Sequence, residues 1–137
     1  MRAFFASMLC AGLFLLVPAC STGTKPIKVT GTLLNEGKPY TAPKGSSVLI
    51  TFVPVLEKGL ADYSPTTKVK ADDSSFVLLG REGNGIPAGK YRVALQQMVP
   101  GGSDEINAMN DRFSTDKSPI FVEVKDATPL IIDMAKQ

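Results

Sequence analysis

The sequence predicts an all-β protein, an antiparallel sandwich of two sheets that follows an N-terminal export segment. Three observations lead to this fold class. Beyond residue 26, apolar residues alternate with polar ones in seven short segments, which is the period of half-buried strands. Turn-forming Gly, Pro, Asn and Asp separate these segments, as they do in sandwich domains. The length of 137 residues suits one domain with its own core.

The composition excludes several classes of function. The chain has no His, so it lacks the base of a Ser-His-Asp or Cys-His triad, and no imidazole is present to ligate a metal. Its 15 Lys and Arg against 13 Asp and Glu leave a net charge of +2, without the basic excess of nucleic-acid-binding modules. We therefore expect no nucleic-acid partner.

Residues 1–19 are interpreted as a signal peptide. An apolar run over residues 3–19 follows Arg2 and is short for a membrane span. The run ends in the sequence VPAC, which resembles the lipobox of bacterial lipoproteins. That resemblance implies cleavage between Ala19 and Cys20 and a diacylglyceryl group on the Cys20 thiol. An ordinary signal cleaved at the same bond, an uncleaved anchor and a buried helix are the alternatives.

Residues 20–26 are expected to tether the domain, residues 27–137, to the lipid. They are small and polar up to Pro26 and span no more than about 20 Å, so the domain would lie close to the membrane. Ser21, a residue other than Asp after the cysteine, favours the outer membrane facing the periplasm. Cys10 falls inside the signal peptide, so the mature chain has no internal disulfide partner.

The first four predicted strands are residues 27–33, 47–55, 66–70 and 75–79. The first places Val29, Gly31 and Leu33 on one face. The second is the most apolar, and it directs Val48, Ile50 and Phe52 inward. Asp72 and its neighbours form the turn between the third and fourth strands.

The last three predicted strands are residues 90–96, 120–125 and 130–134. A segment rich in Gly, residues 80–89, leads into them, and no helix follows its glycines, so it is a turn and not a phosphate-binding loop. Residues predicted to face the core are Tyr91, Val93, Leu95, Ile120, Val122, Val124, Leu130, Ile132 and Met134. Ile131 and Asp133 are predicted to face the other way.

The connection 97–118 is long for a compact domain and is expected to hold one short helix. Ser103 is its candidate N-cap, and Asn110 is the residue expected to stop it. Ile106, Met109 and Phe113 would then share one face that packs on the sandwich. This loop, or an exposed edge strand, is the candidate surface for a protein partner.

Several motifs follow one another along residues 27–134. They are Val29-x-Gly31-x-Leu33, Glu36-Gly37-Lys38-Pro39, Gly45-x-x-Val48-x-Ile50-x-Phe52-x-Pro54, Asp72-Asp73-Ser74-Ser75-Phe76, Ile86-Pro87-Ala88-Gly89-Lys90-Tyr91-x-Val93, Phe113-Ser114-Thr115 and Ser118-Pro119-Ile120-x-Val122-x-Val124. This order resembles the small bacterial lipoproteins, abundant in planctomycetes, with a carboxypeptidase regulatory-like or transthyretin-like domain. The resemblance implies a seven-stranded immunoglobulin-like or prealbumin-type sandwich without established catalytic activity. The transthyretin-like hydroxyisourate hydrolases depend on His, which this chain lacks.

Two sets of side chains are weak candidates for binding sites. Asp72 and Asp73 form the best carboxylate pair for a cation, but Ca²⁺ requires six to eight oxygen ligands and a structural turn also explains the pair. Tyr40, Tyr63 and Phe121 are the aromatic residues whose positions favour exposure, so a sugar could stack on them. We expect no cofactor and no catalytic residue.

The sequence thus predicts a non-catalytic, lipid-anchored envelope module for protein interaction or structural support. Its partners would be the membrane, through Cys20, and an envelope protein. The alternative is a lipoprotein that binds a small molecule or glycan for an uptake complex, which requires an apolar pocket with convergent polar groups. A cavity beneath the 97–118 connection would favour this alternative, and tight packing there would oppose it.

Overall fold

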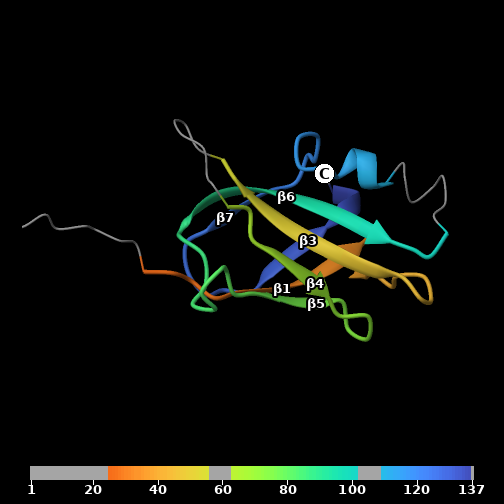
Figure 1. Ribbon diagram of the computed structural model, residues 1–137, viewed down its shortest axis with the longest axis horizontal. Helices are drawn as coiled ribbons and strands as arrows, with labels where there is room; N and C mark the ends of the chain where they lie inside the picture. Colours follow the sequence, from red (N-terminus) through yellow and green to blue (C-terminus); the bar gives the residue numbers. More distant parts are fainter. Residues whose placement is uncertain (1–24, 56–62, 102–108, 137) are drawn as a thin grey trace, which may run out of the picture.

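The structure, a computed structural model, describes residues 25–55, 63–101 and 109–136. Within these ranges the chain is all-β, as predicted, and its strands form two four-stranded sheets that face each other (Figure 1). The strands are β1 (Val29–Asn35), β2 (Lys38–Pro39), β3 (Ser47–Pro54), β4 (Thr66–Val69), β5 (Ser75–Leu78), β6 (Gly89–Met98), β7 (Phe121–Val124) and β8 (Leu130–Asp133). The two-residue β2 has no counterpart among the predicted strands.

The first sheet is built around β1. Strands β2 and β5 pair with β1 in antiparallel fashion along one edge, whereas β8 pairs with its other edge in parallel, from Gly31 opposite Leu130 to Leu34 opposite Asp133. The prediction of a purely antiparallel sandwich is therefore wrong for this pair. Parallel neighbours require a crossover instead of a hairpin, and the chain makes that crossover when it leaves β7 in the second sheet and enters β8 in the first.

The second sheet has the order β4-β3-β6-β7 and is antiparallel throughout. Its longest pairing joins β3 to β6, from Ser47 opposite Met98 to Pro54 opposite Tyr91. At one side of the sandwich the chain passes directly from β4 to β5 in the other sheet. There the Lys70 amide donates to the Ser75 carbonyl at 2.8 Å, which holds the two sheets together along that side.

The core lies between the sheets and is formed by alternate residues of the strands. The predicted inward positions of the first two and the fifth segments are confirmed, since each of their inward side chains is buried. Phe52 of the second sheet lies at the centre of the core, with its ring centroid 6.1 Å from Phe76 of the first sheet and 5.9 Å from Tyr91. The largest fully buried side chains also include Leu33, Ile50, Leu78, Ile86, Leu95, Ile120 and Ile132.

Strand β8 departs from the alternation at its last residue. Ile131 faces outward as predicted and is 75% exposed, but Asp133, also predicted to face outward, is buried with 5% exposure. The turn after β1 covers it, because the Gly37 amide donates to Asp133 Oδ2 at 2.9 Å. The Ala135 amide donates to Asp133 Oδ1 at 3.1 Å. The carboxylate thus joins the β1–β2 turn to the short 3₁₀ helix η1 (Met134–Lys136).

Residues 109–112 of the long connection are helical, while the predicted N-cap Ser103 and the predicted contact Ile106 lie outside the described residues. Met109 packs against the core and Phe113 is buried within it, so these two share a core-facing side as predicted. Asn110 lies inside the helix and does not stop it. Its side chain accepts from the Gln97 amide at 2.7 Å and donates to the Gln97 carbonyl at 2.8 Å, which fastens the helix to β6.

Candidate functional site

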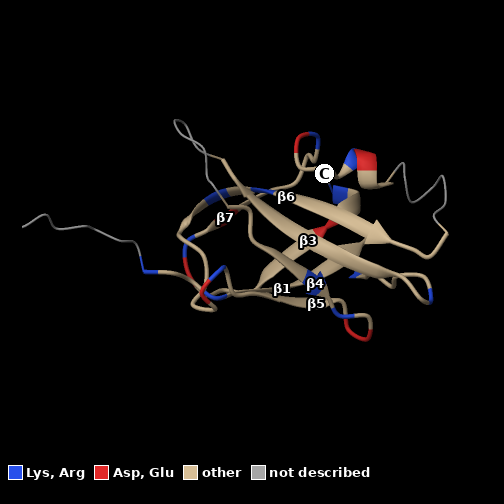
Figure 2. Cartoon of the chain, viewed as in Figure 1, with Lys and Arg blue, Asp and Glu red and all other residues tan. Residues whose placement is uncertain are grey.

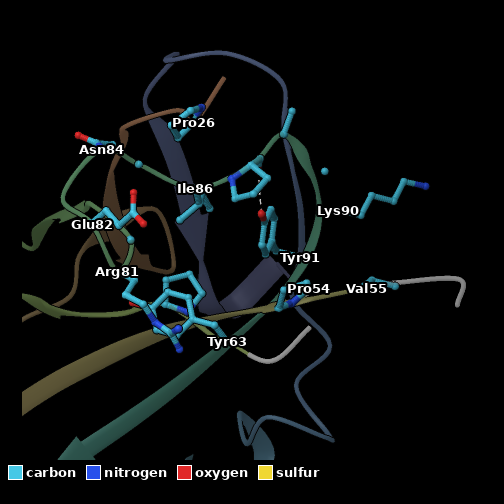
Figure 3. Close-up of a pocket in the computed structure, with 16 residues that line it drawn as sticks. Pro26, Pro54, Val55, Tyr63, Arg81, Glu82, Asn84, Ile86, Lys90 and Tyr91 are labelled. Atoms are coloured by element: carbon cyan, nitrogen blue, oxygen red, sulfur yellow. Dashed lines mark hydrogen bonds between the residues drawn. The ribbon is translucent and has the colours of Figure 1, made fainter. Parts of the chain in front are cut away.

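Figure 1 shows the described chain entering the sandwich at one end. An open cavity of about 550 Å³, called the entry cavity below, lies at this end (Figure 3). Three parts of the chain meet there: the first described residues, the end of β3 with residues 63–65, and the Gly-rich segment that leads into β6. The lining residues are Pro26, Pro54, Val55, Tyr63, Pro65, residues 80–82 and residues 84–91. Residues 56–62 lie outside the described part of the chain.

Backbone hydrogen bonds hold the Gly-rich segment in place as a wall of the cavity. Ile27 and Ile86 exchange two of them, from the Ile27 amide to the Ile86 carbonyl at 2.7 Å and from the Ile86 amide to the Ile27 carbonyl at 2.8 Å. The Gly85 amide also donates to the Leu79 carbonyl at 2.7 Å. This wall requires glycine at position 85, where φ is +115° and a Cβ would collide with the backbone of Ile27.

The surface of the cavity is mostly apolar. Ile86 forms part of its floor and is 2% exposed. The Tyr91 hydroxyl donates to the Pro87 carbonyl at 2.7 Å, drawn as a dashed line in Figure 3. Burial raises the pKa of Tyr91, so its hydroxyl remains a protonated donor at neutral pH. Val55 and Tyr63, which also line the cavity, are 45% and 38% exposed.

The rim carries polar and charged groups. The Arg81 guanidinium carbon lies 4.8 Å from the centre of the Tyr63 ring, a cation–π arrangement. Figure 3 shows Lys90 extending outward from the rim, and Glu82 and Asn84 on the side nearer Pro26. No ion pair of Arg81 or Lys90 occurs among the described residues. An apolar interior with a few polar groups at its edge is the usual composition of a ligand-binding site.

The comparisons with known proteins add no identification. No protein family, no curated protein and no solved structure matches this chain. The fold and the entry cavity define the molecule as an all-β, sandwich-like domain with an open, mostly apolar cavity at one end.

Asp72 and Asp73 lie in the turn between β4 and β5. The Ser75 amide donates to Asp73 Oδ1 at 2.9 Å. Hydrogen bonding by the Ser75 side chain, followed by that of this amide, lowers the pKa of Asp73. The next residue, Ser74, is buried in the left-handed conformation with φ of +58°. These contacts give Asp73 a structural part in the turn. The described residues contain no group of three His, Cys, Asp or Glu that could share a metal ion.

The three aromatic residues predicted to be exposed fall into different surroundings. Tyr63 is 38% exposed and Phe121 is 53% exposed, and an arginine covers each ring. Tyr40 is half-buried, and its hydroxyl donates to Gln97 Oε1 at 2.6 Å. Of the three, Tyr63 alone lines the entry cavity, so the structure does not bring them together as one stacking surface.

The 97–118 connection is one of the two surfaces predicted for a partner, the other being an exposed edge strand, and it is the place where a cavity would favour ligand binding. Phe113 is buried and its carbonyl accepts from the Leu95 amide at 2.9 Å, so this part is packed on the sandwich. A smaller cavity of about 240 Å³ adjoins Asn110 and Phe113. The larger entry cavity lies elsewhere, and the Gly- and Pro-rich segment 80–89, for which the sequence predicts only a turn, forms much of its wall. Ala19 and Cys20 lie outside the described residues.

Replacing Gly85 with Ala is expected to lower the free energy of unfolding by about 3 kcal/mol, because left-handed strain and a backbone collision add together. Gly83→Ala is the matched control, since Gly83 also has a positive φ, +75°, but a Cβ there meets nothing within 4 Å. We expect a loss of about 1 kcal/mol for this control. Urea unfolding measures both values, and amide hydrogen exchange at Ile27 and Ile86 reports the wall itself. Equal losses in the two variants would contradict the proposed close approach.

Proposed function

We propose that this chain is a non-catalytic, lipid-anchored module of the bacterial cell envelope that binds its partner through the entry cavity. The observation that carries the proposal is the position of this cavity. Lys25 is the first described residue and Pro26 lines the cavity, so the site lies next to the segment that would tether the domain. With Cys20 lipidated, the cavity would face the membrane, where an envelope partner is within reach.

We also propose that the domain is of the carboxypeptidase regulatory-like, or transthyretin-like, kind, a seven-stranded immunoglobulin-like or prealbumin-type sandwich. The support for this is the order of the sequence motifs between residues 27 and 134 and the arrangement of the longer strands in two facing sheets. The parallel β1–β8 pair and the small β2 are features that such an assignment must accommodate.

A second function, the binding of a small molecule or glycan for delivery to an uptake complex, is favoured by the volume of the cavity. Its roughly 550 Å³ falls within the range of ligand-binding pockets, about 300–1,000 Å³. Both proposals use the same cavity and differ in what occupies it. For the glycan in particular, the Tyr63 ring that would stack on a sugar is already covered by Arg81.

The anchor is tested by the mass of the mature N-terminal peptide from protein expressed in a bacterial membrane. We expect a peptide that begins at Cys20 and carries the mass of a diacylglyceryl group, with further acylation of its amino group in hosts that perform it. The Cys20→Ala variant is the control and should lack this modification and accumulate uncleaved. An unmodified peptide beginning at Cys20 would overturn the anchor and indicate an exported soluble domain with a free thiol.

A further inference from the structure

We propose that the entry cavity binds an anionic phospholipid of the membrane that holds the anchor. The phosphate would lie at Arg81, the first part of one acyl chain would lie along the apolar wall, and Lys90 would contact neighbouring headgroups. The inference rests on the proposed function, because the tether is what brings the cavity to the lipid surface. It deepens that function by naming the chemistry of the ligand.

The wall of the cavity suits a hydrocarbon chain. Its described surface is formed largely by proline rings, aliphatic side chains and aromatic rings, namely Pro26, Pro54, Val55, Tyr63, Pro65, Ile86, Pro87, Ala88 and Tyr91. Val55, at 45% exposure, is an apolar side chain that an acyl chain would cover, and such burial is favourable. The Tyr91 hydroxyl already donates its hydrogen bond to the Pro87 carbonyl, so an apolar chain beside it leaves no donor unsatisfied.

The rim suits a phosphate diester. A guanidinium binds phosphate through paired N–H groups, and Arg81 is held over Tyr63 without an acidic partner among the described residues. Lys90, directed away from the cavity in Figure 3, is placed to meet a second headgroup. Glu82 is the opposing charge on this rim, and Figure 3 shows its carboxylate turned away from the Arg81 guanidinium.

The other charges at this end are mostly basic. Lys25 and Lys28 are exposed in the entering segment, and Lys125 is paired with Glu123 at 3.0 Å. Acidic segments are interspersed with the basic ones over the molecule (Figure 2). At the cavity end, the unpaired cations outnumber the acids, which favours the surface of an anionic bilayer over that of a zwitterionic one.

The tether limits the distance between the cavity and the membrane surface. Residues 21–24 separate Cys20 from Lys25, and so short a segment spans no more than about 20 Å when fully extended. The cavity wall begins at the very next residue, Pro26. A lipid in the leaflet that holds the anchor is therefore the nearest amphiphile that the cavity could meet.

The test is binding of unlipidated protein to vesicles, because an attached lipid would insert by itself. The mature chain from residue 20 onward carries C20S, and both sheets and their core lie within it. Vesicles of phosphatidylglycerol are compared with vesicles of phosphatidylcholine at low ionic strength in a flotation assay. We expect binding to the anionic vesicles alone, a decrease of at least about tenfold in the double variant R81Q/K90Q, and an increase of a few-fold in E82Q.

Matched variants distinguish binding at the entry cavity from binding that depends only on the net charge or the surface hydrophobicity of the protein. K38Q/K44Q removes the same net charge from exposed positions outside the cavity. Val55→Asp places a charge on the wall, and Met98→Asp makes the corresponding change at a residue of similar exposure, 47%, away from the cavity. We expect loss of binding in R81Q/K90Q and V55D and retention in K38Q/K44Q and M98D. Thermal unfolding by circular dichroism verifies that each variant is folded.

Equal binding to both kinds of vesicle, no binding to either, or equal losses in the cavity and control variants would overturn the proposal. An unchanged V55D variant would overturn the acyl-chain site and leave only headgroup contact. The anchor is judged separately by the mass of the Cys20 peptide. A lipidated Cys20 with no vesicle binding removes this inference and leaves the proposed function, whereas vesicle binding with an unmodified Cys20 removes the anchor and leaves the lipid site.

Discussion

Replacing Phe52 with Ala is expected to lower the free energy of unfolding by about 4 kcal/mol. Phe52 has no exposed surface, and its ring lies against Phe76 of the opposite sheet and Tyr91 of its own sheet. The change removes apolar area and leaves a void that two sheets cannot close without moving. Since a domain of this size is stabilised by about 5–15 kcal/mol, such a loss brings the protein close to unfolding. Urea unfolding followed by circular dichroism measures it.

Phe121→Ala is the matched control for this prediction. It deletes the same atoms from a strand of the same sheet, but Phe121 is 53% exposed and contacts Arg92 on the outer face. We expect a loss below about 1 kcal/mol, the usual size for a surface change. If both variants lost stability equally, the burial pattern of β3 and β7 would be wrong.

Replacing Gly31 with Val is expected to cost about 3 kcal/mol. A Cβ at this position would lie 2.5 Å from the Leu130 carbonyl oxygen and 2.5 Å from the Phe76 ring. Valine is favoured in strands by up to about 1 kcal/mol, so strand preference and packing act in opposite directions here. The cost of the collision exceeds the gain from strand preference, because the oxygen belongs to the backbone of β8 and cannot move without opening the parallel pair.

The control for Gly31→Val is Thr30→Val on the same strand. Thr30 is half-exposed and faces the opposite side of the sheet, so a valine there enters no crowded space. We expect a change within about 0.5 kcal/mol. Loss of stability in Gly31→Val should also increase hydrogen exchange at the amides of β8, such as Ile132. A tolerated valine at position 31 would show that β8 does not approach β1 as closely as described.

The positions of the strands were predictable because each strand has one face toward the core. In β1, β3 and β6 the alternation of apolar and polar residues records this difference directly, and their inward residues are the ones that are buried. The same argument placed Met109 and Phe113 on one side of the helical segment. Whether a side chain faces the core depends on its position within its own strand or helix, so the pattern of neighbouring residues is enough to predict it.

The alternation of apolar and polar residues does not predict which strands pair or which polar residues have structural roles. Nothing in the residues of β8 says that its neighbour is β1 or that the pairing is parallel. Asp133 looked like a surface residue, and it is buried because the distant Gly37 amide bonds its carboxylate. Asn110 looked like the end of a helix, and it instead bonds both backbone groups of Gln97. Each error concerns a partner that is remote in the sequence.

The sequence by itself determined the all-β class, the approximate strands and their inward faces, because hydrophobic periodicity depends only on neighbouring residues. It also contains the motif from which the anchor at Cys20 is predicted. The tertiary structure alone decided the parallel β8, the burial of Asp133 and the entry cavity. That cavity forms where Pro26, Tyr63 and Arg81 meet from three separate parts of the chain. A site of this kind depends on distances between such parts, and a one-dimensional pattern does not carry those distances.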